Sequence, residues 1–99
     1  MVKITFLDNS ELHIKADTVL NGYKRSDKVG AEYYLTNVFT DSIDGKFSKE
    51  GSLVATVNPK VGISGFLLSV DCFSVGLDTE NNVLYFSSAV KSVENLTVL

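Results

Sequence analysis

The fold is decided most directly by one stretch, Met1-Val-Lys-Ile-Thr-Phe-Leu-Asp-Asn-Ser-Glu-Leu-His-Ile-Lys-Ala16. Apolar and polar residues alternate on both sides of a polar centre, and alternate residues of a strand lie on opposite faces of its sheet. The stretch therefore predicts a β-hairpin with one buried face and one exposed face.

The apolar pattern also limits the register of this hairpin, because a one-residue slip would move every apolar side chain to the wrong face. A three-residue loop at Asp8-Asn9-Ser10 makes every inner pair apolar, and Asn tolerates the left-handed conformation that such loops need. The inner pairs would be Phe6 with Leu12, Ile4 with Ile14 and Val2 with Ala16. A two-residue turn is rejected because it would set Phe6 opposite His13.

The outer face of the hairpin carries one unfavourable feature in this register. Lys3 lies opposite Lys15, and such a like-charge pair costs about a few tenths of a kcal/mol unless an acidic side chain is close. His13 lies on the same outer face, opposite Thr5. An acidic side chain from another strand or from another copy would offset this repulsion, and in that case the lysine pair would be a first indication of an interface.

Further strands are predicted along the rest of the chain. Asn21-Gly22 is expected to bend the chain before a polar loop at residues 23–30. A strand follows at 32–40, with its register left open, and another at 53–57 is expected to end at Asn58-Pro59. A long β-rich run covers residues 63–75. A second hairpin should close over residues 78–82 with Val75 opposite Tyr85, and residues 87–99 favour one helical turn followed by a strand.

Ninety-nine residues are enough for one domain, residues 1–99, with a core that needs neither disulfide nor metal. Six or seven short strands predict an all-β fold, a small antiparallel sandwich or barrel with at most one short helical turn near the C-terminus. So small a sheet protein has few strands with which to cover its own edges. Pairing with another copy is therefore expected.

Composition narrows the classes of function. The net charge of −3 argues against a duplex-DNA binder, because such proteins present a basic face. Cys72 is the single cysteine, which excludes an intramolecular disulfide and favours a cytoplasmic protein. No run of apolar residues is long enough to span a membrane, and no secretory signal is recognised.

No group of residues has the types and spacing that a known chemistry requires. His13 is the single histidine and lies far along the chain from Cys72, so neither a catalytic dyad nor a zinc site is predicted. Asp78-Thr-Glu-Asn-Asn82 offers oxygen ligands but lacks the spacing of an EF-hand loop, and a hairpin turn is preferred. We expect no enzymatic activity, no metal and no cofactor.

One stretch has binding character, because cations beside aromatic rings are what stacked single-stranded bases use in small β-barrels. Its members are Tyr23, Lys24, Arg25, Lys28, Tyr33 and Tyr34. A solvated loop beside two half-buried tyrosines has the same composition, and we prefer this interpretation to a nucleic-acid-binding site.

The opening residues 2–16 and the closing Ala89-Val-Lys-Ser-Val-Glu94 resemble the ends of short uncharacterised proteins of phages and prophages of Gram-positive bacteria. The resemblance covers about a quarter of the chain and assigns no functional residue. It implies a small accessory protein of a mobile element that acts by binding, in the host cytoplasm.

The expected function is a non-enzymatic interaction or assembly module that binds itself, another protein, or both. The alternative is a small β-barrel that binds single-stranded nucleic acid or a nucleotide through Tyr23, Lys24, Arg25, Lys28 and a neighbouring tyrosine. A third hypothesis is an enzyme whose site is completed by a neighbouring copy.

Overall fold

The computed structural model describes residues 1–25, 35–43 and 58–96. The elements in this part of the chain are β1 (Val2–Phe6), β2 (Glu11–Ile14), β3 (Leu20–Arg25), β4 (Leu35–Asp41), α1 (Pro59–Ser69), β5 (Cys72–Val75), β6 (Tyr85–Phe86), a 3-10 turn (Ser87–Ala89) and β7 (Val90–Asn95). Two antiparallel sheets result, with strand orders β2-β1-β7 and β4-β3-β5-β6. The sheets do not close into a barrel, so the predicted β architecture is present in its sandwich-like form.

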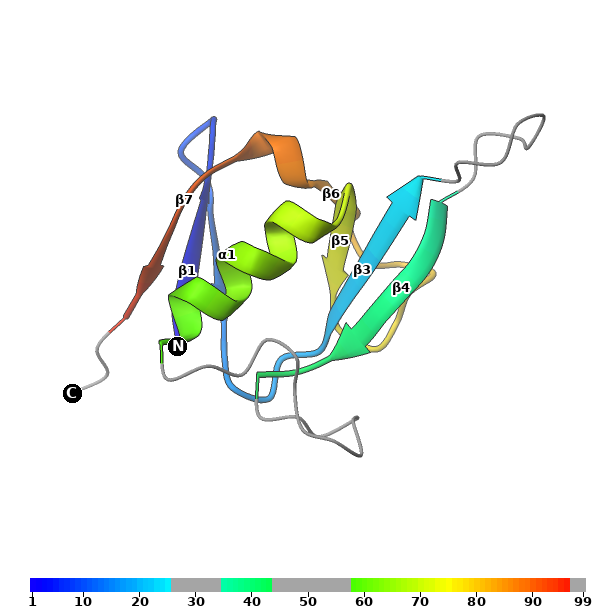
Figure 1. Ribbon diagram of the computed structural model, residues 1–99, viewed down its shortest axis with the longest axis horizontal. Helices are drawn as coiled ribbons and strands as arrows, with labels where there is room; N and C mark the ends of the chain where they lie inside the picture. The colour runs from blue at the N-terminus through cyan, green and yellow to red at the C-terminus, as the bar shows by residue number, and fades with distance from the viewer. Residues whose placement is uncertain (26–34, 44–57, 97–99) are drawn as a thin grey trace.

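The core lies between the two sheets and α1, which crosses the front of the molecule between them (Figure 1). Stacked rings join the sheets: the ring centroid of Phe6 in β1 lies 5.1 Å from that of Tyr85 in β6 and 6.4 Å from that of Phe73 in β5. Phe66 of α1 completes this cluster edge-on to Phe73, with centroids 6.4 Å apart. Burying aromatic rings of this size supplies much of the stabilisation of a small core.

The first hairpin has the predicted faces but not the predicted pairing. Its loop is residues 7–9, closed by a hydrogen bond from the Phe6 N–H to the Ser10 carbonyl (2.9 Å), and Ile4 therefore lies opposite Leu12. Asn9 holds the left-handed conformation, with φ of 70°. The pairing differs from the prediction by two residues, and a shift by two leaves every side chain on its face. The predicted apolar inner face is confirmed for Val2, Ile4, Phe6 and Ile14, which are buried, but not for Ala16, which is exposed beyond the end of β2.

Asp8 explains why the loop lies one residue earlier than predicted. Its carboxylate accepts hydrogen bonds from the Ser10 N–H (2.9 Å) and the Ser10 hydroxyl (2.6 Å), which forms a local turn around Asn9. These bonds hold the pKa of Asp8 below its ordinary value. The Lys3–Lys15 pair predicted on the outer face is wrong, because Lys3 lies opposite His13.

The bend predicted at Asn21-Gly22 is also wrong, because both residues lie inside β3 at the centre of its sheet. The Asn21 amide donates to the Ser74 hydroxyl (3.2 Å) and to the Gly76 carbonyl (2.9 Å), so it is satisfied although buried. Gly22 lies directly under α1. A Cβ at Gly22 would lie 2.8 Å from side-chain carbons of both Phe66 and Val70, so only glycine admits the helix at this distance.

Strand β4 covers most of the run predicted at 32–40 and fixes the register that the sequence left open. Phe39 lies opposite Gly22, and Asn37 lies opposite Tyr23. Val38 is therefore an extra residue in β4, which is the arrangement of a β-bulge. The strand predicted at 53–57 and the turns around it lie outside the described residues.

The largest departure from the predicted fold is α1, an eleven-residue helix where residues 63–75 were expected to form a strand. Only the last part of that run is extended, as β5. The expectation of at most one helical turn is therefore wrong. Pro59 does not end a strand; it occupies the first turn of the helix, where a proline costs no hydrogen bond.

The C-terminal predictions agree better with the structure. The predicted helical turn is the 3-10 turn, and the predicted strand after it is β7, which pairs with β1. The second hairpin is also present, but Tyr85 lies opposite Phe73 instead of Val75, again a shift of two residues.

Candidate interaction surface

The amino end of α1 is bound by Asn95 of β7, which belongs to the β2-β1-β7 sheet. Asn58 precedes the helix but makes no capping bond with its own side chain. Instead, Asn95 at the end of β7 accepts a hydrogen bond from the Lys60 N–H through Oδ1 (2.9 Å) and donates through Nδ2 to Asn58 Oδ1 (2.6 Å). This contact joins the amino end of α1 to the end of β7.

The inward face of α1 is fully apolar and buried, through Ile63, Phe66 and Leu67. The opposite face consists of Val61, Ser64, Gly65 and Leu68, which we call the outer stripe. Their spacing of three and four residues places them in one line along the helix. Val61 is 56% exposed and Leu68 is 90% exposed.

A surface helix ordinarily carries charged residues on its outer face. Lys60 is the single charged residue of α1. Its outer stripe therefore exposes apolar surface where a soluble helix would be polar, which is a feature of interaction sites.

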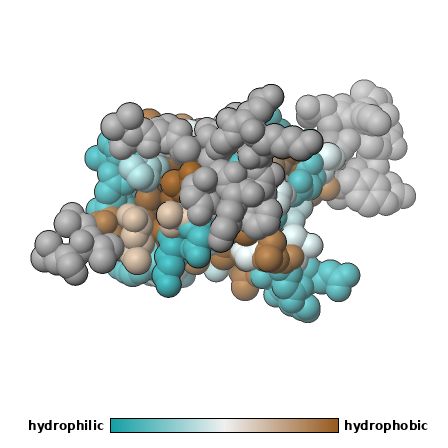
Figure 2. All heavy atoms as spheres, turned by 90° about the horizontal axis from the view of Figure 1, so that it is seen from below, coloured by the Kyte–Doolittle hydropathy of each residue, from teal (hydrophilic) through white to brown (hydrophobic). Residues whose placement is uncertain are grey.

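A second apolar surface lies at the tip of the first hairpin. A shallow cleft of about 390 Å³ is formed by residues 6–8 and Ser10 on one side and by residues 84–86 and Ala89 on the other. Leu7 and Phe86 at this cleft are 65% and 63% exposed. On the opposite side of the molecule, seen from below in Figure 2, hydrophobic residues also lie between hydrophilic ones.

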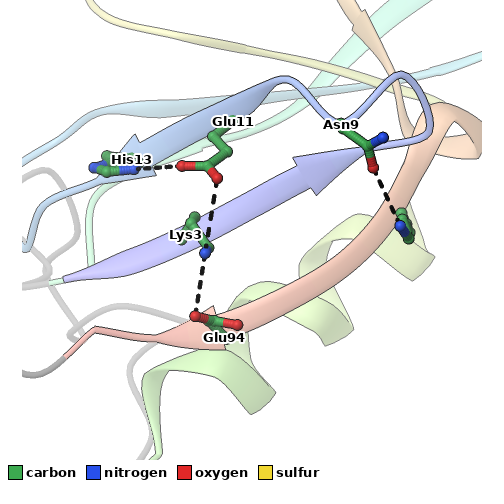
Figure 3. A network of polar contacts seen from close by, with 6 residues as sticks. Lys3, Asn9, Glu11, His13 and Glu94 are labelled. Atoms are coloured by element: carbon green, nitrogen blue, oxygen red, sulfur yellow. Dashed lines mark hydrogen bonds and ion pairs between the residues drawn. The ribbon is translucent and has the colours of Figure 1, made fainter.

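The outer face of the β2-β1-β7 sheet is polar instead. Lys3 in the central strand lies between Glu11 of β2 (3.8 Å) and Glu94 of β7 (3.2 Å), and the three side chains run across the sheet (Figure 3). His13 Nε2 lies 3.4 Å from Glu11 Oε1. The acidic partners of Lys3 are thus supplied by neighbouring strands of the same chain.

The structure describes three of the six predicted binding residues. Tyr23 is partly buried, and Lys24 and Arg25 are exposed at the end of β3. The Asp71 carboxylate accepts a hydrogen bond from the Arg25 N–H (2.8 Å) and lies 3.8 Å from Arg25 Nε. The charge of Arg25 is therefore partly balanced. Lys28, Tyr33 and Tyr34 lie outside the described residues, so the grouping of all six stays a prediction.

The residues considered for catalysis are not brought together. His13 is exposed on the outer face of one sheet, whereas Cys72 is buried in β5 of the other. Burial raises the pKa of the Cys72 thiol, and the neighbouring Asp71 adds to this effect. Within the described residues no three potential metal-ligating side chains gather. Residues 78–82 form a turn in which Asp78 accepts hydrogen bonds from Asn81 and Asn82.

The outer stripe was missed because the β-rich run predicted at residues 63–75 covers most of α1. One available signal was Asn58-Pro59, since a proline directly after an asparagine is typical of a helix start. The spacing of Val61, Gly65 and Leu68 acquires meaning only once the helix is recognised.

No protein-family model, no curated protein and no solved structure matches this chain. In the part of the chain that the structure describes, no helix is long and apolar enough to cross a membrane.

Proposed function

We propose that the protein is a non-enzymatic interaction and assembly module that associates with itself and with another protein. The observation that carries this proposal is the outer stripe of α1, where Val61 and Leu68 are exposed on a helix with one charged residue. Burying a leucine side chain is worth about 1.5–3 kcal/mol, so covering this face with protein is favourable.

The distribution of the polar residues supports binding over catalysis. Lys3, Glu11 and Glu94 compensate one another across a sheet surface, and Arg25 is balanced by Asp71. The cleft at the hairpin tip adds a second place where an apolar group of a partner would fit. The resemblance to phage and prophage proteins fits a binding role in the host cytoplasm.

Sedimentation velocity across concentrations from low micromolar to millimolar tests the self-association. The monomer mass is 10.8 kDa, and we expect the weight-average mass to rise above it as the concentration increases. High salt should leave the association largely intact, because an apolar contact is not screened. A strict monomer at millimolar concentration would refute self-association.

A further inference from the structure

We propose that the outer stripe of α1 is covered by a second copy of the chain, with the two α1 helices antiparallel about a two-fold axis between Ser64 and Gly65. This inference rests on the proposed self-association and specifies its surface. It is carried by three properties of α1: its symmetry, its small residues and its charge.

The outer stripe is complementary to itself. Val61 and Leu68 are equally far along the helix from the point between Ser64 and Gly65. In an antiparallel pair, Val61 of one copy therefore meets Leu68 of the other, and Ser64 meets Gly65. A two-fold interface requires this reciprocal matching, in which one patch serves both subunits.

The centre of the stripe allows two helices to approach closely. Nothing lies within 4 Å of the position that a Cβ of Gly65 would occupy, so the surface there is open. The Ser64 hydroxyl already donates to the Lys60 carbonyl (2.6 Å), and the Ser69 hydroxyl donates to the Gly65 carbonyl (2.7 Å). Hydroxyl groups that are bonded within their own helix lose little when water is removed from them.

The charges at the two ends of α1 favour a second copy of the chain as the partner, and they favour an antiparallel over a parallel pair of helices. Lys60 lies in the first turn of α1, which has no basic residue in its last turn. An antiparallel pair places Lys60 beside the other helix's carboxyl end, whose free carbonyls carry partial negative charge. A parallel pair would instead place the two Lys60 side chains together.

The size of this contact sets its expected strength. An eleven-residue helix is about 16 Å long, and a pair of such helices buries an area at the lower end of specific interfaces. We therefore expect a dimer in reversible exchange with the monomer, not a permanent assembly.

Sedimentation velocity on two interface variants and a control tests the inference. Leu68→Lys places a charge at the most exposed position and should weaken dimerisation at least tenfold. Gly65→Glu enters open space, so the fold should be retained, but the two glutamates would face each other at the axis. We expect Gly65→Glu to be monomeric and at least as stable as the wild-type monomer, because Glu favours helix more than Gly does. Leu77→Lys changes a similarly exposed leucine away from α1 and should dimerise as the wild type does.

Cross-linking tests the orientation. Ser64→Cys lies next to the axis, and mild oxidation should link two copies through residue 64. Ser88→Cys is exposed elsewhere and should give no comparable linked dimer. The buried Cys72 is common to both variants and so cancels from the comparison.

The outcomes separate this inference from the proposed function. A wild-type protein that remains monomeric overturns both. A dimer that survives Leu68→Lys and Gly65→Glu overturns the α1 pairing and leaves self-association standing through another surface. Loss of the dimer in both variants, with linkage at Ser64→Cys, supports both.

Discussion

At Gly22, the helix α1 and the residue that follows it pack closely on a central strand. The side chains of Phe66 and Val70 lie where its Cβ would be, and Phe66 is held in place by Phe39, whose ring centroid is 5.1 Å away. The absence of a side chain at position 22 is therefore what permits the packing of α1.

We expect Gly22→Ala to destabilise the protein by about 1–3 kcal/mol, the usual cost of an overpacked core. This cost should exceed the gain of about 0.4–1 kcal/mol that alanine brings by restricting the unfolded chain. Urea denaturation followed by circular dichroism measures the difference. Gly65→Ala is the matched control and should be stabilised, because its methyl group enters open space in a helix. A Gly22→Ala variant as stable as the wild type would contradict the close contact.

Cys72 should be protected in the native protein. Its thiol is buried and its pKa is raised above the ordinary 9.0, so little thiolate exists near neutral pH. We expect slow reaction with a disulfide reagent in native buffer and fast reaction in denaturant. Ser88→Cys provides the exposed comparison and should react at once. Rapid modification of native Cys72 would show that β5 opens readily.

The same pKa shift has a consequence at alkaline pH. A thiol whose folded pKa is raised favours the folded state while it stays protonated, and that contribution is lost as the pH rises above the unfolded value of 9.0. Stability should therefore decline above this pH, in addition to any effect of the lysines and tyrosines.

At the scale of elements, the strands were more predictable than the helix. Alternation placed Val2, Ile4 and Phe6 on the buried face, and this held although both hairpin pairings were shifted by two residues. Such a shift changes neither face, so alternation alone cannot detect it. The loop position depends on the hydrogen bonds of Asp8, which hydrophobic pattern does not encode.

The helix α1 could not be predicted from periodicity. Its sequence, Pro59-Lys-Val-Gly-Ile-Ser-Gly-Phe-Leu-Leu-Ser69, is rich in glycine and β-branched residues, which disfavour helix, and it lacks a polar face. The missing polar face is also the property on which the proposed interface depends. The lack of a polar face therefore both prevents recognition of the helix from its sequence and makes the outer stripe a candidate interaction surface.

The connection between α1 and β7 gives a prediction at this scale. Replacing Asn95 by alanine removes the acceptor for the Lys60 N–H and the donor to Asn58. The loss should cost about 0.5–2 kcal/mol, as for other helix caps. Asn95→Asp keeps the acceptor and adds negative charge at a helix amino end, so it should retain more stability. Thermal denaturation of both variants measures this order, and equal stability would contradict the capping role.

At the scale of the whole molecule, the excess of acidic over basic residues argues against the hypothesis that the protein binds single-stranded nucleic acid. The net charge is −3, and Asp71 lies beside Arg25. We expect no measurable binding to labelled single-stranded oligonucleotides at physiological salt in fluorescence anisotropy, because phosphate binding relies on uncompensated cations. Salt-sensitive binding that weakens on Lys24→Ala would instead favour the nucleic-acid hypothesis, and Lys91→Ala would serve as its control.

The pairing of β1 with β7 has a consequence for how the protein is made. Val2 lies opposite Asn95, so the central strand of one sheet stays half-paired until nearly all of the described chain has left the ribosome. Contacts between residues so far apart in sequence form slowly, because a long loop must close first. The nascent chain would then expose its apolar hairpin face throughout synthesis, and folding would be completed only after β7 emerges and Asn95 reaches the helix.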